Sequence, residues 1–429
     1  MTRSRWFRLV ALLATFVLIG ASCGGDDDDG APAAETCPDD EFGCVEVAQG
    51  APITIGSLLV ISGPNASLGT DSQRGVELAI DNLDDSLDAT GGQVLGHDVR
   101  LVAEDDGCAA EGGQAGGRSL ATNPDMVAVI GTSCSSAGVP ASQILSEEGI
   151  LLISPSNTGS NLTDPELDYT PFYARTAHND LIQGAAMAQF VGEELGLTTA
   201  ATIHDGSPYA EGLANAFAAS FQEDFGGEIT TQEAVQVGQT EMRPVLTSIA
   251  ADSPEFVYYP VFIPEGAAIT QQARETEGLE DADLAGADGM LSPDFVDAAG
   301  ESSEGMYLSG PDISFKGDFY KGEFLPAYED QYGEQPTAPF HAHAYDAANV
   351  VFEAIEEVAI ETDDGGLLIP RTQLRDAVYA TDYQGILGQI SCNDTGDCLP
   401  ETTIAVNQIT NGEFDPIFTV TLSLEEVTG

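Results

Sequence analysis

Two loops rich in hydroxyl groups contain the residues of this chain best suited to hold a small anion. Each loop follows an apolar segment, 126–130 in one case and 150–153 in the other, and a helical stretch separates them. Because the strands of such a unit end on one edge of a parallel sheet, we expect both loops to line one crevice. The residues concerned are Ser135, Ser136, Ser156, Asn157 and Thr158. Hydroxyls and N–H groups at a helix start suit a carboxylate, although these residue types are also common helix caps.

These loops belong to a longer alternation of strands and helices. In the first part of the chain, the predicted strands are 53–61, 99–103, 126–130 and 150–153. After residue 177, the predicted strands are 200–204, 228–235, 256–259, 283–286 and 305–308. The last part is predicted to contain helices at 319–332, 340–360 and 370–380 and strands at 385–391, 403–408 and 417–422. The pattern predicts an α/β protein with two doubly wound parallel sheets, each covered by helices on both faces.

The alternation divides the 429-residue chain into two lobes. The first lobe is predicted at 52–176 plus 310–385, and the second at 177–309 plus 386–429. The chain would then cross between the lobes three times.

The amino-terminal segment has the organisation of an export signal. Residues 1–22 combine a basic head, an apolar run too short to span a bilayer and small residues before Cys23. This pattern predicts a signal peptide and lipidation of Cys23. Gly20 stands where most lipoprotein signals have leucine, so an ordinary secreted protein is the alternative. Residues 23–51 are polar and acidic, which predicts a disordered tether.

Six cysteines remain once Cys23 is assigned to lipid, and an even number in an exported protein favours disulfides. The predicted pairs are Cys37 with Cys44, Cys108 with Cys134, and Cys392 with Cys398. No C-x-x-C motif occurs and the five histidines lack the spacing of metal ligands, so we expect neither a metal nor another cofactor. His341 and His343 are interpreted as structural.

The net charge of −58, from 71 acidic and 13 basic residues, limits the possible partners. Nucleic acid is excluded because its binding needs a basic surface. A strongly anionic ligand is disfavoured, although salt screens the field within about 8 to 10 Å. So acidic and lysine-poor a surface suggests a saline habitat.

Two chemical alternatives remain open. The phosphate-loop, nucleophile-elbow and zinc-protease motifs are absent, but an exported serine hydrolase using Ser135 stays possible in principle. The loop CNDTGDC, 392–398, offers calcium the oxygens of Asn393, Asp394 and Asp397, whereas a disulfide-closed turn explains the same residues more simply.

Several stretches together resemble the branched-chain amino-acid-binding proteins of ABC transporters. They are EDDGC at 104–108, VIGTSCSSAGVPAS at 129–142, GILLISPSNT at 149–158, ARTA at 174–177, IHDGSPYAEGLA at 203–214, FVYY at 256–259 and YDA at 345–347. The resemblance implies the type I periplasmic-binding-protein fold, in which two α/β lobes joined by three crossovers close on a ligand. It also implies the pairing of Cys108 with Cys134.

The resemblance carries ligand roles to individual positions. It assigns the ligand carboxylate to Ser135, Thr158 and a backbone group at Asn157, and the ligand ammonium to Asp288, where the family has a longer glutamate. A buried carboxylate needs a partner charge, which an α-ammonium supplies; the alternative is a solvated loop aspartate.

Aromatic positions of the family match only in part. Tyr209 corresponds to a tyrosine that packs on the ligand, whereas Leu68 and Phe262 replace tyrosines of the best-known members. The alternative for all three is ordinary core packing. The replacements predict a more apolar pocket, so the amino-acid class is better supported than branched-chain ligands in particular.

The sequence therefore predicts a lipid-anchored, extracytoplasmic solute-binding protein, not an enzyme, that captures an amino acid between closing lobes and delivers it to a membrane permease. A short amide, urea or a small carboxylate is the alternative ligand. Such a ligand would leave Asp288 unpaired.

Overall fold

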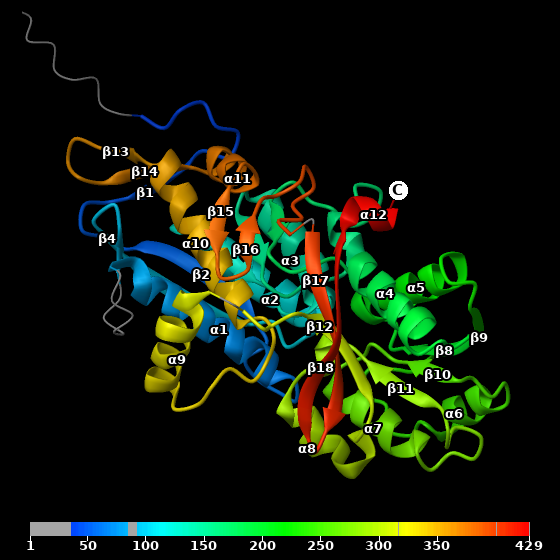
Figure 1. The fold of residues 1–429 in the computed structure, drawn as a ribbon. Coiled ribbons are helices and arrows are strands. Elements are labelled where there is room, and N and C mark those ends of the chain that lie inside the picture. The colour runs from blue at the N-terminus through cyan, green and yellow to red at the C-terminus, as the bar shows by residue number, and fades with distance from the viewer. Residues whose placement is uncertain (1–35, 85–91, 316, 400, 429) are drawn as a thin grey trace, which may run out of the picture. The chain divides into compact units, whose positions relative to one another are not determined.

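The computed structural model describes residues 36–84, 92–315, 317–399 and 401–428, which form two α/β lobes (Figure 1). The predicted signal peptide, Cys23 and the first part of the predicted tether lie outside these residues. Within the described ranges, no helix is both long and apolar enough to cross a membrane.

The first lobe is built on a six-stranded sheet. Its strands, in spatial order, are β3 (Gln93–Val94), β4 (His97–Asp105), β2 (Ile53–Leu59), β5 (Met126–Gly131), β6 (Leu151–Ser154) and β7 (Tyr173–Arg175). All neighbours pair in parallel except β3, which is antiparallel to β4. The carboxyl ends of β5 and β6 therefore lie on one edge of the sheet, where we expected the two hydroxyl-rich loops.

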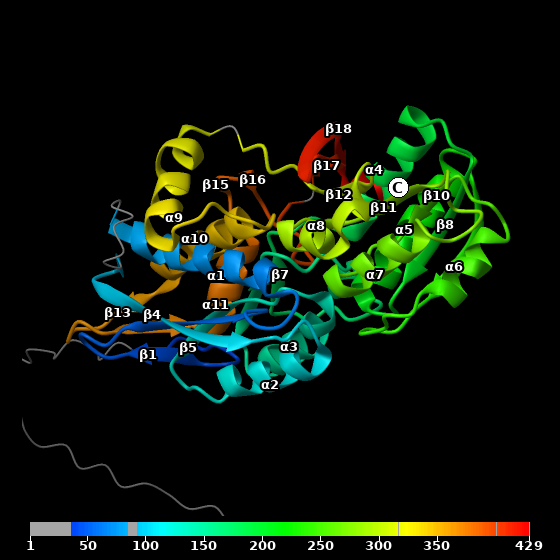
Figure 2. The same ribbon diagram turned by 90° about the horizontal axis from the view of Figure 1, so that it is seen from below.

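Helices cover both faces of this sheet (Figure 2). One face carries α1 (Ala66–Asp81) and α10 (His341–Val358), and the other carries α2 (Ala110–Ala121) and α3 (Ser135–Glu147). Alternate residues of β5 enter the two cores, with Ile130 in the first and Val129 in the second. Gly75 allows α1 and α10 to cross closely, because a Cβ there would collide with the carbonyl oxygen of His341.

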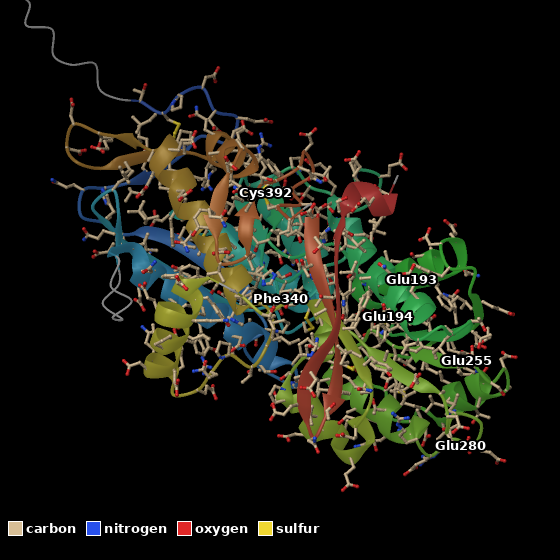
Figure 3. The ribbon with its side chains drawn as sticks, viewed as in Figure 1. Glu193, Glu194, Glu255, Glu280, Phe340 and Cys392 are labelled. Atoms are coloured by element: carbon tan, nitrogen blue, oxygen red, sulfur yellow. A yellow bond between two sulfur atoms is a disulfide. The ribbon has the colours of Figure 1, made fainter. Side chains whose placement is uncertain are left out.

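The second lobe contains a seven-stranded sheet. Its strands, in spatial order, are β18 (Glu413–Ser423), β17 (Glu401–Thr410), β12 (Tyr307–Pro311), β11 (Asp283–Gly286), β10 (Phe256–Tyr258), β8 (Thr199–His204) and β9 (Glu228–Ala234). Its helices are α4 (Asp180–Gln189), extended by a π-helical turn η3 (Phe190–Glu194), α5 (Pro208–Glu223), α6 (Arg243–Ala250), α7 (Ile263–Ala273), α8 (Pro293–Ala299) and α12 (Leu424–Thr428). Glu193, Glu194, Glu255 and Glu280 point outward from this lobe (Figure 3), in keeping with the acidic composition.

The segment from residue 36 to 51 is folded, so the prediction of a disordered tether over 23–51 was wrong for this part. Strand β1 (Cys44–Val47) pairs antiparallel with β14 (Leu367–Pro370), which also pairs with β13 (Ile360–Glu361). Val45 and Val47 enter the core of the first lobe, and a disulfide joins Cys37 to Cys44. Two buried valines and a covalent link order a segment whose overall composition is polar.

The third crossover lies later than predicted. Residues 386–399 were assigned to the second lobe, yet β15 (Tyr383–Gly385) and β16 (Gly388–Ile390) pair with each other and Ile390 packs in the first-lobe core. Leu399 packs there too, and the chain joins the second sheet only with β17. Because β15 and β16 satisfy each other's backbone hydrogen bonds, this hairpin does not need to pair with a strand of the second sheet.

Shorter elements complete the lobes. They are α9 (Leu325–Tyr332), preceded by the π-helical turn η6 (Tyr320–Phe324), α11 (Arg371–Tyr379), and the 3-10 turns η1 (Asn82–Asp84), η2 (Ser160–Thr163), η4 (Asp288–Met290) and η5 (Gly300–Ser303). The three predicted disulfides, Cys37–Cys44, Cys108–Cys134 and Cys392–Cys398, are confirmed.

Candidate functional site

A small cavity is lined by residues of both lobes. They are Leu68, Ser133, Cys134, Ser135, Ser156, Thr158, Tyr209, Phe262, Asp288, Gly289 and Phe340. Figure 3 marks Phe340, which comes directly before α10. Beside the cavity, the Ser292 hydroxyl of the second lobe lies 3.2 Å from the Ser67 hydroxyl of the first.

Six of the seven ligand-site residues predicted from the sequence share this cavity. They are Leu68, Ser135, Thr158, Tyr209, Phe262 and Asp288. The seventh, Asn157, does not line it. Its side chain accepts a hydrogen bond from Thr132 Oγ1 at 3.0 Å and donates one to the Thr132 carbonyl at 2.9 Å, and its backbone N–H donates to Ser154 Oγ. Asn157 therefore shapes the loop beneath the wall.

The first-lobe wall presents hydroxyl groups in a fixed arrangement. Ser135 begins α3, and its hydroxyl accepts a hydrogen bond from the Gly159 N–H at 3.1 Å. Thr158 is 1% exposed, and its hydroxyl has no partner at hydrogen-bond geometry among the described residues. The Asp180 carboxylate lies near this hydroxyl, which also lines the cavity and can turn towards a ligand.

Below this wall, a chain of serines ties the two loops together. The Ser156 hydroxyl donates to the Ser133 carbonyl at 2.9 Å, and the Ser154 hydroxyl donates to the Thr132 carbonyl at 2.8 Å. The Ser133 N–H donates to the carboxylate of Asp106 at 2.7 Å. These bonds fix the loop after β5 to the loop after β6, so both present their polar groups together.

The second-lobe wall centres on Asp288, at the start of η4 after β11. Its Oδ1 accepts hydrogen bonds from Tyr209 OH and Gln183 Nε2, each at 2.9 Å. Burial raises the pKa of Asp288 to about 6, although both hydrogen bonds oppose the rise. Among the described residues of the lining, Asp288 is the acidic one and no basic side chain is present.

A second carboxylate lies close to Asp288. Asp180, the first residue of α4, is fully buried, and neither of its carboxylate oxygens has a partner at hydrogen-bond geometry among the described residues. Burial and the nearby charge of Asp288 raise the pKa of Asp180 well above its usual value, and the neighbouring Thr158 hydroxyl offsets only part of that rise. The site thus concentrates negative charge without an adjacent cation in its lining.

Gln183 connects Asp288 to a buried histidine. Its Oε1 lies 2.5 Å from Nε2 of His178, so that the imidazole donates and the amide orientation is fixed. Burial lowers the pKa of His178 to about 4, which keeps the ring neutral. The Gln183 amide group can then direct its N–H donors at Asp288 and at Ser309 Oγ, 3.0 Å away.

The remaining wall is apolar. Leu68 is 5% exposed and packs with Val60 and Ala338, and the partly buried Phe262 contacts this cluster. The rings of Phe262 and Tyr209 lie 5.1 Å apart between centroids. The cavity therefore joins neutral donors on one lobe, a carboxylate on the other and an apolar surface between them, which fits a small zwitterion with an apolar side chain.

Comparison with known proteins agrees with this geometry. A family model described as "Periplasmic binding protein" matches residues 52–413. The chain belongs to the periplasmic binding protein family.

Individual members of the family resemble the chain over most of its length. The leucine-, isoleucine-, valine-, threonine- and alanine-binding protein of Pseudomonas aeruginosa is 27% identical over 337 residues, 79% of this chain and 84% of that protein. LivJ of Streptococcus pneumoniae, solved in complex with isoleucine, has a TM-score of 0.72 at 25% identity, covering 87% of this chain and 99% of that one.

A third protein shows how widely the fold is used. A solute-binding protein of R. palustris, solved in complex with benzoate, has a TM-score of 0.72 at 20% identity, covering 87% of this chain and 98% of that one. The predicted type I periplasmic-binding-protein fold is confirmed, and the chain is a substrate-binding protein of the ABC-transporter kind.

Several residues around the cavity had not been assigned roles from the sequence. Phe340, Gly289 and Ser133 line it, whereas Asp180 and Gln183 lie behind it. Asp180 follows the family-like ARTA stretch closely, which is a usable signal. Gln183 and Asp288 are 105 residues apart in the sequence, and no local sequence pattern predicts their contact.

The surroundings of Ser135 and of the loop 392–398 do not favour the hydrolase and calcium alternatives. In the described residues, no histidine is hydrogen-bonded to the Ser135 hydroxyl, and the protein's named relatives are binding proteins. In the loop, Asn393 Oδ1 accepts from the N–H groups of Thr395 and Asp397, and Asp397 pairs with Arg175. The described part of the chain has no cluster of three or more metal-ligating side chains.

Proposed function

We propose that this protein is the exported, lipid-anchored solute-binding component of an ABC importer and that its ligand is an amino acid. The observation that carries the proposal is the polarity of the cavity. Neutral donors lie on the first-lobe wall, and a buried carboxylate lies on the second. An α-amino acid carries the complementary groups on a single carbon.

The ligand carboxylate would bind the first lobe. The unpaired hydroxyl of Thr158, the hydroxyl of Ser135 and the start of α3 supply the donors. Asn157, which we also assigned to the ligand carboxylate from the sequence, instead holds the loop through its hydrogen bonds to Thr132 and Ser154. Because a zwitterion has no net charge, the acidic surface does not repel it over distance.

The ligand ammonium would bind Asp288. This carboxylate is 4% exposed and already oriented by Tyr209 and Gln183, and a cation brought by the ligand would restore its ionised form. Because the two ligand charges contact different lobes, the closed state binds the ligand better than an open one, and that difference drives closure. The membrane permease would accept the closed form.

The side chain of the ligand would contact Leu68, Phe262, Tyr209 and Phe340. These residues favour an apolar side chain, in keeping with the isoleucine of the S. pneumoniae complex and with the leucine, isoleucine and valine in the name of the P. aeruginosa relative. Cys23 would carry the lipid after removal of residues 1–22.

A small carboxylate is the second candidate. The R. palustris protein, solved with benzoate, shares the fold, and the aromatic wall here could face such a ring. A ligand of this kind, like urea or a short amide, would leave Asp288 without a cation. Protonation of Asp288, whose pKa burial raises to about 6, would then accompany binding.

A thermal-shift screen of the purified protein in high salt would test the proposal. Its ligands are the amino acids, short amides, urea and benzoate. A ligand at a hundredfold excess over its Kd adds about 2.7 kcal/mol to stability. Amino acids should raise the melting temperature, and Asp288→Ala should abolish the rise by weakening binding about 2 to 5 kcal/mol.

Asp283→Ala is the matched control. Asp283 begins β11, which leads to Asp288, but does not line the cavity. The control should keep the shift. A response to benzoate or an amide alone, unaffected by Asp288→Ala, would refute the ammonium site and leave the fold intact.

A further inference from the structure

We propose that Arg175 and Asp397 are positioning residues that hold the ligand-binding loop 157–159 in place. The inference deepens the proposed function and rests on it, since this loop is the one assigned to the ligand carboxylate. Neither residue lines the cavity, and both would act through Thr158 and Ser135.

Arg175 contacts the loop through its backbone. One guanidinium nitrogen, Nη1, donates to the carbonyls of Asn157 at 3.1 Å and Gly159 at 2.9 Å. These carbonyls belong to the residues before and after Thr158, so a single nitrogen holds the 157–158 and 159–160 peptide planes. The other terminal nitrogen, Nη2, donates to Thr163 Oγ1 at 2.9 Å, which fixes the chain beyond the loop.

The same contacts reach the second ligand-binding hydroxyl. Gly159, whose carbonyl is held by Arg175, uses its N–H to bond Ser135 Oγ at 3.1 Å. Arg175 thus holds the backbone on both sides of Thr158, including the residue whose N–H bonds the Ser135 hydroxyl.

Asp397 fixes Arg175 from the opposite side. Its Oδ1 lies 2.5 Å from Arg175 Nε, and the two side chains are 4% and 0% exposed. The backbones also pair, because Arg175 N–H donates to the Gly396 carbonyl at 2.8 Å and Cys398 N–H donates to the Arg175 carbonyl at 3.0 Å. The loop 392–398 therefore covers the free edge of β7.

The loop that carries Asp397 is itself constrained. The Cys392–Cys398 disulfide closes it (Figure 3 marks Cys392), and Asn393 Oδ1 accepts from Asp397 N–H at 3.0 Å. Arginine suits this task because its planar fork can satisfy a carboxylate and several carbonyls at once, which the single ammonium of lysine cannot. The acidic turn 392–398, the alternative calcium site, thus holds Arg175 in place. We call Asp397 and this turn the brace.

Hydrogen exchange of the unliganded full chain would test the brace. Asp397→Asn keeps the shape and removes the charge, and Arg175→Lys keeps the charge and removes the fork. In both variants, the amides of residues 157–160 should exchange at least tenfold faster than in the wild type. Asn393→Ala, which leaves both charges in place, should give a smaller change in the same amides.

The control is Asp346→Asn. Asp346 is an equally buried acid of the first lobe that accepts from the N–H groups of Ile386 and Leu387, away from the cavity. It should lower the melting temperature without changing exchange at 157–160. Unchanged exchange in Asp397→Asn and Asn393→Ala, or an equal change in Asp346→Asn, would overturn the proposal.

Calorimetry with the amino acid found in the screen completes the test. Asp397→Asn should bind it at least tenfold more weakly and Asp346→Asn within twofold of the wild type. Equal affinity in Asp397→Asn would show that the brace does not serve the site. If no amino acid binds the wild type, the proposed function fails, and hydrogen exchange, which needs no ligand, still decides whether the brace exists.

Discussion

Two clusters of buried charge lie near each other in this protein and differ in one respect. Arg175 and Asp397 form a complete ion pair within the chain, and the other contacts of the guanidinium also lie inside the first lobe. Asp288 and Asp180 are two buried acids, and no basic side chain lines the cavity beside them among the described residues. The charge of Arg175 offsets part of the burial of Asp180 as well, whereas no basic side chain of the described lining faces Asp288, where we propose that a ligand brings the counter-charge.

The difference has an energetic meaning. A buried charge without a partner is unfavourable, so burial raises the pKa of Asp288 towards its neutral form. A buried pair, by contrast, is damaged chiefly when one member is removed, because the other is then left alone. The size of the stability loss on mutation should therefore distinguish the two clusters.

The largest effect is expected from breaking the complete pair. Asp397→Ala should lower the free energy of unfolding by about 3 to 5 kcal/mol, because it leaves the Arg175 charge buried without its carboxylate. Urea unfolding of the unliganded protein would measure this. Asp288→Ala is the matched variant and should lose less, since it removes the acceptor of the Tyr209 and Gln183 hydrogen bonds but leaves no charge unpaired. Equal losses in the two variants would contradict the comparison.

Measuring stability as a function of pH should reveal the buried carboxyl of Asp288. Because the pKa of Asp288 rises from 3.8 to about 6 on folding, the folded state holds a proton between those values that the unfolded chain has released. Stability contributed by this group is present below pH 4 and is lost as pH rises through 6, by about 2 to 3 kcal/mol.

The comparison with Asp288→Asn isolates this group from Asp71, Asp106 and Asp346, whose pKa values burial also raises. The stability curves of wild type and variant should converge or cross between pH 4 and 7, and parallel curves would refute the assignment. Affinity for an amino acid should fall as pH drops below about 6, because the ammonium needs the ionised carboxylate.

Removing the Cys392–Cys398 disulfide should affect the Arg175–Asp397 pair less than removing Asp397 does. Replacing Cys392 and Cys398 by Ser should cost about 2 kcal/mol of stability by the loop-closure argument. Asn393 would still orient Asp397, so the ion pair should persist. The double replacement of Cys37 and Cys44 is the control: thermal unfolding should show a similar loss, and neither variant should weaken ligand binding as much as Asp397→Asn does.

The smallest effect concerns a single hydroxyl. Thr158→Val removes a buried hydroxyl that eases the burial of the Asp180 carboxylate and makes no other side-chain hydrogen bond in the described structure, so the free energy of unfolding of the unliganded protein should fall much less than in Asp397→Ala. Amino-acid affinity should fall by about 1 kcal/mol, the net worth of one hydrogen bond. Thr202→Val is matched, because the Thr202 hydroxyl is also buried and unpartnered in the described structure but lies on β8 outside the cavity. Loss of affinity in both variants would contradict a specific role for Thr158.

The sequence predicted the strands around the site because parallel buried strands are continuous apolar runs, as at 126–130 and 150–153. Ser135, Ser156 and Thr158 followed from the loops after these strands, whereas the family resemblance implied Leu68, Tyr209, Phe262 and Asp288. The contacts behind the cavity could not be predicted in this way: Arg175 and Asp397 are separated by 222 residues, and their charges look ordinary in an acidic chain. Asn157 was expected to offer the ligand a backbone group, but its N–H donates to Ser154 Oγ and its carbonyl accepts from Arg175, and residue type reveals neither contact.

The pairing of β1 with β14 bears on how the protein can be produced. A chain shortened to begin at Pro52 would lose β1 and leave one side of β14 without its backbone partners, next to the apolar surface that Val45 and Val47 cover. An uncovered sheet edge of this kind invites intermolecular strand pairing and aggregation. Recombinant protein should therefore retain the chain from Thr36 onward, with Cys37 and Cys44 oxidised.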